Sequence, residues 1–432
     1  MTSERATTLG RIWPIAELDR SNQLELYDSR DVMSKPTLKL YIRVNSSVDI
    51  DKAVAILADK DISAERGITG ESIYVRQILQ TEDLNKFETG DSGIPIDPRA
   101  GELALMGHNI MRHHITKHSL PEGLTRSVPI FVRVYTEIAK SRRCYECYRR
   151  ESEYNTELKV GPHKHVVALG DRTQQYNKDT FDPSRAPLFY NTRPRYKFPA
   201  IPKKRVFEIQ TYPSIIASKL LAPEPGQTII DACAGPGRKS IHIAELMEQR
   251  GKLYAFEIDY RRKSLIRERA QRFGININDF MFAVALDSTK EVKVRRILNG
   301  SKVDSVLIDP PCSSLGTRPK IYEPAIMDKW QYFRAIDTQR NVLGTMSRFV
   351  KKGGRLVYST CTLNREENEI QIERFLKVRE GEFALEKPKL TGVDLEPYLC
   401  RTEGPCEKKA LEFLPKPHDS PGYFIAVLKK EE

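Results

Sequence analysis

From residue 206 onward, short apolar runs alternate with amphipathic segments, and this alternation limits the fold more than any other feature of the chain. Runs such as TIIDACA (228–234) and VDSVLI (303–308) are rich in β-branched residues, which favours strands. Intervening segments such as 238–250 and 261–274 place apolar residues at helical spacing. Strands that alternate with helices form a parallel sheet covered on both faces. The sequence therefore predicts an α/β fold, with a doubly wound, Rossmann-like domain over residues 206–432. Near its end, LEFLP and YFIAVLKK predict a terminal hairpin.

The first half of the chain has a different pattern of apolar and polar residues and divides into three parts. Residues 1–83 contain the strand-like LKLYIRVN, the helical DIDKAVAILADKD and the strand-like ESIYVRQIL, which predict a small α/β unit. Residues 84–182 have short strand-like runs and frequent turns, of which VPIFVRVYTEIA (128–139) is the clearest strand; this is typical of a small, mostly β module. Residues 183–205 are rich in proline and basic residues, and the prolines exclude long helices and sheet interiors, so we expect a connector.

Composition limits the class of protein and its surroundings. A chain of 432 residues suggests two or three domains at roughly 150 residues each. The net charge of +12 and the pI near 9.2 slightly favour a polyanionic partner such as nucleic acid. The 7 cysteines are odd in number and scattered, which fits a reducing compartment rather than a disulfide framework. There is no signal-like or membrane-spanning apolar run, so we expect a soluble, cytoplasmic monomer.

Three successive strand ends carry the residues of a nucleoside-binding site. The first strand ends at Asp231 and leads into a turn with Gly235 and Gly237, which let a ligand approach the backbone closely. The next strand ends at Glu257, where a carboxylate can accept both ribose hydroxyls. The third ends at Asp287, in reach of an adenine amino group. Strand-end turns often hold glycine and aspartate, so one feature alone would mean little. Three in register predict an adenosine-containing cofactor, and the loop lacks the spacing that binds nucleoside triphosphates.

Two cysteines follow the next two strands. Cys312 lies in IDPPCSSLGTRP and Cys361 in VYSTCTLNREENE, each flanked by hydroxyl residues. A lone cysteine is usually a small buried hydrophobic residue, but two at matching strand ends favour a reactive site. Asn364 with Glu367 three residues later fits a helix cap, which is structural rather than catalytic.

The motifs DACAGPGRKS, IDPPCSSLG and YSTCTLNREENE resemble the signatures of the Sun (Fmu/NSUN) family of RNA 5-methylcytosine methyltransferases, over most of residues 206–432. Carbon five of cytosine is a poor nucleophile, and a thiolate that adds to carbon six activates it. The resemblance implies that Cys361 is the nucleophile, that Cys312 promotes product release, and that Asp309 and Lys239 act at the base. It implies S-adenosyl-L-methionine as cofactor. The cofactor residues that it implies are Cys233, Ala234, Gly235, Pro236, Gly237, Arg238, Lys239, Glu257, Arg262, Asp287 and Asp309.

The N-terminal half extends this resemblance. The segment beginning LYIRVN is similar to the family's RRM-like unit, and IDPRAGELALMGHNIMRHH with VPIFVRVYTEIAKSRR is similar to a diverged PUA domain. A Sun enzyme with a PUA insert resembles the branch that acts on the tRNA acceptor stem, which implies RNA, and more narrowly tRNA, as the partner. Two positions depart from the family pattern: Arg238 stands where glycine is usual and Ser240 where threonine is usual.

Basic and aromatic residues mark candidate RNA contacts. Guanidinium groups beside Tyr145 and Tyr148 suit RNA stacking and phosphate binding, although a solvated charged face would look the same. The predicted RNA-binding residues are Arg142, Arg143, Arg149, Arg150, Lys203, Lys204, Arg205 and Arg318. Cys144 and Cys147 form one C-x-x-C without a second pair, so we expect no metal site.

Two other functions fit parts of the pattern. A DNA cytosine methyltransferase would use a Pro-Cys nucleophile, which would be Cys312. A non-catalytic RNA-binding or assembly protein could keep the fold. The Ser-Thr-Cys motif argues against the first, and the presence of Cys361, Cys312, Asp309 and Lys239 argues against the second.

Overall fold

The structure is a computed structural model. It describes residues 37–59, 62–76, 206–318 and 332–431 in full, together with the backbone of four short segments and the first residues of one helix. The described residues fall into two compact units. One contains the small α/β segment after residue 38 and the C-terminal half of the chain, and the other contains the strands between residues 94 and 191.

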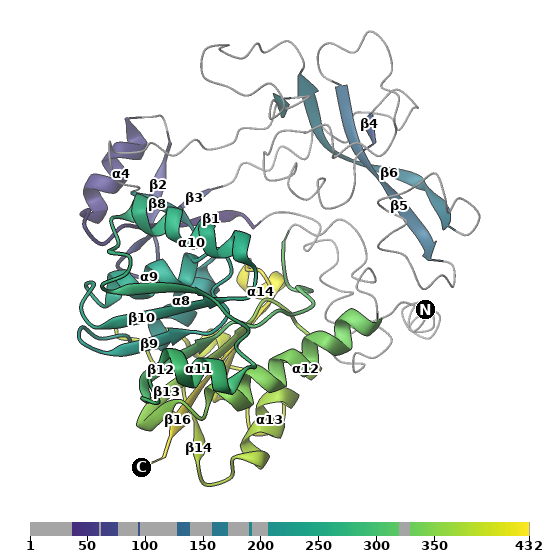
Figure 1. The fold of residues 1–432 in the computed structure, drawn as a ribbon. Coiled ribbons are helices and arrows are strands. Elements are labelled where there is room, and N and C mark those ends of the chain that lie inside the picture. The colour runs from purple at the N-terminus through teal and green to yellow at the C-terminus, as the bar shows by residue number, and fades with distance from the viewer. Residues whose placement is uncertain are drawn as a thin grey trace. The chain divides into compact units, whose positions relative to one another are not determined.

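The C-terminal half is built on an eight-stranded sheet in the order β11-β10-β9-β12-β13-β16-β14, with β15 paired to β16 (Figure 1). The strands are β9 (Thr228–Asp231), β10 (Lys252–Glu257), β11 (Met281–Ala285), β12 (Val303–Ile308), β13 (Val350–Thr360), β14 (Phe383–Glu386), β15 (Ala410–Phe413) and β16 (Tyr423–Lys430). The strands from β9 to β13 are parallel to one another, as the sequence predicts. Strand β16 pairs antiparallel with β13, β14 and β15, so the sheet is mixed, and the predicted pairing of β15 with β16 is confirmed.

Helices cover both faces of this sheet. They are α8 (Tyr212–Leu220), α9 (Arg238–Leu246), α10 (Tyr260–Phe273), α11 (Glu291–Ile297), α12 (Lys329–Met346) and α13 (Glu369–Val378). Successive residues of a strand point to opposite faces, and Ile229 and Ile230 of β9 accordingly belong to two different buried clusters. The first cluster contains residues of α8, α9 and α10, and the second contains residues of α11, α12 and α13. The doubly wound arrangement is therefore confirmed.

A smaller antiparallel sheet belongs to the same compact unit. Its order is β2-β3-β1-β8, formed by β1 (Lys39–Val44), β2 (Ala64–Arg66), β3 (Ser72–Arg76) and β8 (Phe207–Ile209), with α4 (Ile50–Ala58) after β1. Asp49 caps α4 by accepting hydrogen bonds from two backbone amides. Strand β8 comes directly before the C-terminal half in sequence yet completes the small sheet by pairing with β1. The chain therefore passes into the larger domain directly from β8, the edge strand of the smaller sheet.

The second unit contains a four-stranded sheet in the order β4-β5-β6-β7. Its strands are β4 (Ile94–Pro95), β5 (Val128–Ile138), β6 (Leu158–Asp171) and β7 (Tyr190–Asn191). The strand predicted at 128–139 is confirmed as β5, which pairs antiparallel with β6. The basic residues predicted to bind RNA at positions 142–150 and 203–205 lie outside the described residues, as do Cys144 and Cys147.

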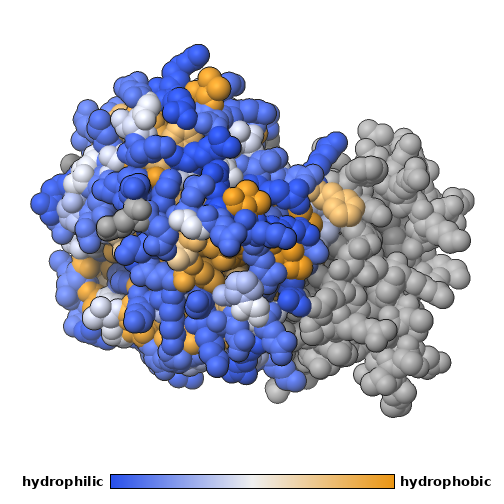
Figure 2. Space-filling view, turned by 90° about the horizontal axis from the view of Figure 1, so that it is seen from below, coloured by the Kyte–Doolittle hydropathy of each residue, from blue (hydrophilic) through white to orange (hydrophobic). Residues whose placement is uncertain are grey.

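The surface in Figure 2 is mostly hydrophilic, and the hydrophobic residues on this face form small groups. Among the described residues, no helix has the length and the apolar content that a membrane crossing needs.

Ion pairs between side chains join the small sheet to the larger domain. Arg43 of β1 is 1% exposed, forms an ion pair with Glu245 of α9, and donates from Nε to Gln210 at 3.0 Å. Lys219 of α8 donates to Glu71 at 2.9 Å. Removing one partner of a buried pair leaves the other charge without compensation, so these contacts fix how the two sheets pack.

Replacing Arg43 with alanine should therefore lower the free energy of unfolding by about 3–5 kcal/mol. Arg66→Ala is the matched control, because Arg66 is 61% exposed in its ion pair with Asp51 and such pairs contribute at most about 1 kcal/mol. Urea unfolding followed by circular dichroism measures both. Equal losses in the two variants would contradict a structural role for the buried pair.

Candidate active site

The two predicted cysteines lie together at the carboxyl edge of the sheet. Strands β12 and β13 are parallel and pair Ile308 with Tyr358, so the loops that follow them leave the sheet side by side. The Sγ atoms of Cys312 and Cys361 are 3.4 Å apart, and Cys361 Sγ is 3.6 Å from Ser314 Oγ. The Gly316 amide donates to the Cys361 carbonyl at 3.0 Å, which joins the two loops directly. Both residues are only partly buried.

A lysine–aspartate pair stands beside the thiols. Lys239, in the first turn of α9, forms an ion pair with Asp309, which directly follows β12. Ser359 Oγ donates to Asp309 at 3.2 Å, and the Tyr423 hydroxyl lies 3.5 Å from the same carboxylate. Lys239 Nζ also lies 5.7 Å from the centre of the Tyr423 ring. The structure thus brings together all four predicted catalytic residues and adds Ser359 and Tyr423, which the sequence analysis missed.

The surroundings make the two thiols unequal. The hydrogen bond shared with Cys312 lowers the pKa of Cys361 against the opposing effects of burial and the Asp309 charge, and the Ser314 hydroxyl and the Lys239 cation lower it further. The same hydrogen bond, together with burial and the charge of Glu367, raises the pKa of Cys312 well above its ordinary value. Burial opposes the charge on Lys239, but Asp309 raises the pKa of this lysine, which therefore stays protonated. The thiolate, which is the reactive form of cysteine, thus forms first on Cys361.

The glycine loop after β9 has the conformation that the sequence predicts. Gly237 caps the start of α9 with φ of 87°, a value that favours glycine. Asp231 is 1% exposed, and its Oδ2 accepts a hydrogen bond from Ser240 Oγ at 2.6 Å. Burial raises the pKa of Asp231 to about 6, and its Oδ1 has no hydrogen-bond partner. A buried, unpaired acceptor beside a glycine loop fits a site that a polar ligand completes.

The other predicted cofactor residues differ in their surroundings. Glu257 is 5% exposed at the end of β10 and accepts from the Asp259 amide at 2.9 Å. Asp287 accepts from both the amide and the hydroxyl of Thr289, so one of its oxygens is already engaged. The side chain of Arg262 is exposed on the first turn of α10.

Arg238 departs from the family pattern, and its side chain forms an ion pair outside the glycine loop. Its Nε donates to Glu208 of β8 at 3.1 Å, and Arg269 contacts the other oxygen of the same carboxylate at 3.3 Å. This pair ties the first turn of α9 to the small sheet. A contact of Arg238 with a cofactor remains a prediction.

The predicted cap after Cys361 is only half confirmed. Asn364 Oδ1 accepts from the Glu366 amide and begins a 3₁₀ turn over Arg365–Glu367, as a cap should. The side chain of Glu367 does not return to the backbone of Asn364, as a capping box would require. It instead accepts hydrogen bonds from Ser313 and Gln339, far away in sequence.

Cys400 and Cys406 are buried in the second of the two hydrophobic clusters. Cys400 Sγ donates to Glu369 at 3.6 Å. Among the described residues, Glu369, Cys400 and Glu412 place one potential metal-ligand atom each within 4.8 Å of one another. This grouping was not foreseen from the sequence, because the three residues come from distant segments.

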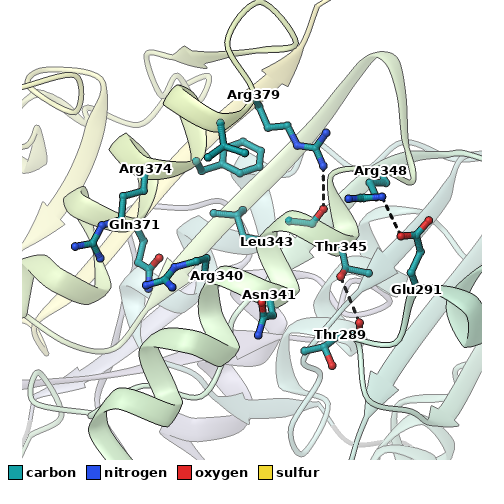
Figure 3. Close-up of a pocket in the computed structure, with 13 residues that line it drawn as sticks. Thr289, Glu291, Arg340, Asn341, Leu343, Thr345, Arg348, Gln371, Arg374 and Arg379 are labelled. Atoms are coloured by element: carbon teal, nitrogen blue, oxygen red, sulfur yellow. Dashed lines mark hydrogen bonds and ion pairs between the residues drawn. The ribbon is translucent and has the colours of Figure 1, made fainter.

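Arginines line a separate cavity of about 380 Å³ between α12, α13 and the start of α11. Arg340, Arg348, Arg374 and Arg379 lie around it, with Glu291 on one side (Figure 3). Arg348 pairs with Glu291 at 3.1 Å, and Arg379 donates to a backbone carbonyl of α12 at 3.3 Å. This is a concentration of positive charge among residues that the sequence analysis did not single out.

A doubly wound sheet with a glycine loop after its first strand and acids after the next two defines a methyltransferase-like, nucleoside-binding domain. Comparison with known proteins agrees: residues 218–429 match the family model described as 16S rRNA methyltransferase RsmB/F. Residues 218–429 are thus similar to the RsmB/F methyltransferases, and the resemblance to Sun enzymes is confirmed.

Similar proteins include two that carry a tRNA-specific name. The tRNA (cytosine(72)-C(5))-methyltransferase of Pyrococcus horikoshii is 30% identical over 61% of this chain and 64% of its own length. Human tRNA (cytosine(72)-C(5))-methyltransferase NSUN6 is 33% identical over 43% of this chain and 38% of its own length. The chain thus matches less than two thirds of the length of these relatives. The crystal structure of NSun6 from P. horikoshii with SFG superposes with a TM-score of 0.71 at 23% identity, covering 100% of this chain and 98% of that one, which shows a shared fold.

The unequal thiols predict unequal alkylation in the absence of substrate. A lowered pKa means that the Cys361 thiolate is present at a lower pH than an ordinary cysteine thiolate, so iodoacetamide should modify Cys361 before Cys312 near pH 7. Lys239→Met removes a nearby cation and should slow Cys361 alkylation; a pKa rise of about one unit would cut the thiolate fraction about tenfold. Lys408→Met is the control, because Lys408 is 77% exposed and is not among the groups that shift the pKa of either thiol. Peptide mass spectrometry reads each site, and an unchanged Cys361 rate in Lys239→Met would refute the assigned charge effect.

Proposed function

We propose that this chain is an S-adenosylmethionine-dependent RNA methyltransferase that methylates carbon five of a cytosine. The observation that carries the proposal is the pair of thiols 3.4 Å apart, with Cys361 favoured as thiolate and Cys312 as thiol. Methylation at carbon five needs one attacking thiolate and a means to release it, and this pair supplies both. A DNA enzyme of the Pro-Cys type would need Cys312 as the thiolate, which is the opposite order.

The residues around the glycine loop fit the proposed cofactor. We infer that the loop from Cys233 to Lys239 lies along it, that Glu257 accepts its ribose hydroxyls and that Asp287 faces its adenine. The unpaired Oδ1 of buried Asp231 is an acceptor that a cationic or N–H-bearing ligand would satisfy. When bound, S-adenosylmethionine supplies an electrophilic methyl group on sulfonium.

The catalytic residues then have distinct tasks. The Cys361 thiolate adds to carbon six of cytosine, and the ring electrons displaced by this bond make carbon five nucleophilic. We propose that Asp309, which pairs with Lys239 and accepts from Ser359, accepts a hydrogen bond from the amino group of the cytosine, and that the Lys239 cation offsets the negative charge of the adduct. After carbon five is methylated, its proton passes to solvent water and the electron pair of that C–H bond re-forms the ring double bond. The carbon–sulfur bond breaks in the same step, and the Cys361 sulfur leaves as thiolate. Cys312, beside Cys361, assists this release by hydrogen-bonding the departing thiolate.

The proposed substrate is RNA, and more narrowly the acceptor stem of tRNA. The names of the Pyrococcus and human relatives support the narrower choice, and the basic charge supports a nucleic acid. The four-stranded antiparallel sheet of β1, β2, β3 and β8 supports an RRM-like unit, and the β4–β7 sheet supports a PUA-like module over 84–182. Bisulfite sequencing of tRNA after incubation with the protein and cofactor would identify the cytosine.

The arginine-lined cavity extends the proposal to the RNA backbone. Guanidinium groups bind phosphates through several donors at once, and four of them gather at this cavity with one carboxylate. Arg340 and Arg374 are 53% and 47% exposed, and their ion pairs are of the weak surface kind that a phosphate can replace. We propose that this cavity contacts RNA phosphates.

The roles of the two cysteines predict opposite results in two variants. Cys312→Ala should accumulate a protein–RNA adduct that resists denaturation, because the release step is impaired. Cys361→Ala should form none, because no covalent bond can start. Gel mobility under denaturing conditions with radiolabelled RNA and cofactor measures this. An adduct in Cys361→Ala but not in Cys312→Ala would reverse the assignment, and no turnover by the wild type on any RNA despite binding would favour a non-catalytic RNA-binding protein.

Charge reversal at the cavity should weaken RNA binding in a salt-dependent way. The double variant Arg340→Glu with Arg374→Glu should lower affinity and reduce the slope of log K against log salt by about 0.7–0.9 for each lost phosphate contact. Arg250→Glu is the control, because Arg250 is 64% exposed in a surface pair with Glu248 and does not line the cavity. Fluorescence anisotropy with tRNA at several salt concentrations measures both, and matching slopes would exclude the cavity as a contact.

A further inference from the structure

Glu367 is a fully buried carboxylate whose hydrogen bonds are directed at the loop of Cys312. It is 0% exposed. Its Oε1 accepts from the Ser313 amide at 2.8 Å and from Gln339 Nε2 at 2.9 Å. Its Oε2 accepts from the Ser313 hydroxyl and from Asn364 Nδ2, the latter at 3.2 Å. Burying a carboxylate is costly unless it is well paired, and four donors meet that need here.

These bonds hold Cys312 from both sides in sequence. Ser313, the residue after Cys312, gives Glu367 both its amide and its hydroxyl. Gln339 of α12 donates to the carbonyl of Pro311, the residue before Cys312, at 3.0 Å. Gln339 also donates to Glu367, so Glu367 and Gln339 form one connected clamp around Pro311–Cys312–Ser313.

The clamp is anchored to the loop of Cys361. Glu367 lies on the same loop as Cys361, and its backbone carbonyl accepts from the Tyr358 hydroxyl of β13 at 2.6 Å. Ser313 Oγ also lies 2.8 Å from Thr362 Oγ1, next to Cys361. The carboxylate of Glu367 therefore fixes the Cys312 loop relative to the Cys361 loop. None of its hydrogen bonds described above involves a sulfur atom.

Such a fixed spacing matters because a hydrogen bond between two sulfurs depends on where each loop sits. The 3.4 Å separation of the two Sγ atoms is what lets Cys312 and Cys361 share a hydrogen bond. The negative charge of Glu367 adds to the difference in pKa between the two thiols, since it is one of the groups that raise the pKa of Cys312.

We propose that Glu367 is a positioning residue that, with Gln339, keeps the Cys312 thiol beside Cys361 so that it is ready to release the methylated base. The inference rests on the methyl-transfer chemistry proposed above. It assigns to Glu367 a function in catalysis instead of the capping role that the sequence suggests.

Alkylation without RNA tests the geometry first. In Glu367→Gln, whose amide replaces one acceptor oxygen by a donor, the clamp should loosen, so Cys361 should lose its hydrogen bond and Cys312 should become more reactive. We expect the ratio of Cys361 to Cys312 alkylation near pH 7 to fall about tenfold, as a relative pKa change of one unit would produce. Glu369→Gln is the matched control, because Glu369 is also buried and lies two residues away but contacts Cys400. An unchanged ratio in folded Glu367→Gln, or an equal fall in Glu369→Gln, would overturn the proposal.

Reaction with RNA and cofactor tests the role in release. Glu367→Gln should keep the wild-type KM for RNA, show a lower kcat and accumulate a denaturation-resistant adduct, as Cys312→Ala does but to a smaller extent. A merely structural loss would lower the amount of active protein without any adduct, and this result would also overturn the proposal.

A second variant keeps the test decisive if Glu367→Gln does not fold. Gln339→Ala removes the donor to Pro311 and to Glu367 and should shift the alkylation ratio in the same direction. An unchanged ratio in Gln339→Ala would count against the clamp. A wild type that forms neither methylated RNA nor adduct would refute the proposed function, whereas the alkylation ratio would still decide whether Glu367 positions Cys312.

Discussion

The parallel pairing of β12 with β13 is the constraint on which the rest of the site depends. Because these strands run in the same direction and lie next to each other, the loops after Ile308 and Tyr358 leave the sheet at one edge. Gly316 then approaches so closely that a Cβ there would lie 2.0 Å from the Gly422 carbonyl oxygen. That tight packing fixes the Cys312 loop against the segment before β16, and the Gly316 amide bonds the Cys361 carbonyl. A sheet with β12 and β13 apart would leave two unrelated thiols.

Electrostatics then gives the paired thiols different chemistry. The hydrogen bond between the two sulfurs lowers the pKa of Cys361 and raises the pKa of Cys312, and the charges of Lys239 and Glu367 add to this difference. Asp309 fixes the lysine and remains accessible at the same edge. A pair of thiols with unequal pKa values is therefore built from groups on separate segments, each placed by the end of a strand or the start of a helix.

The sequence predicted the parts of the fold that depend on local pattern. The strands from β9 to β13, the glycine at the start of α9 and the terminal pairing of β15 with β16 follow from periodicity and turn residues. The motifs that resemble the Sun family also pointed to Cys312, Cys361, Asp309 and Lys239, which the structure brings together. What pattern could not give are contacts between distant segments. Glu367 has the spacing of a capping box but bonds Ser313, and Arg238 pairs with Glu208 of a strand that joins the small sheet.

By itself, then, the sequence determined which side chains stand at the strand ends, because the alternation of apolar runs and helices places the turns of a parallel sheet. Only the tertiary structure decided which of those ends meet and which charges face each thiol. Cys312 and Cys361 are separated by 48 intervening residues, and Glu367 and Ser313 by 53, as their sequence separations of 49 and 54 show. Strand order and loop packing, which no local pattern encodes, bring these groups within hydrogen-bond distance.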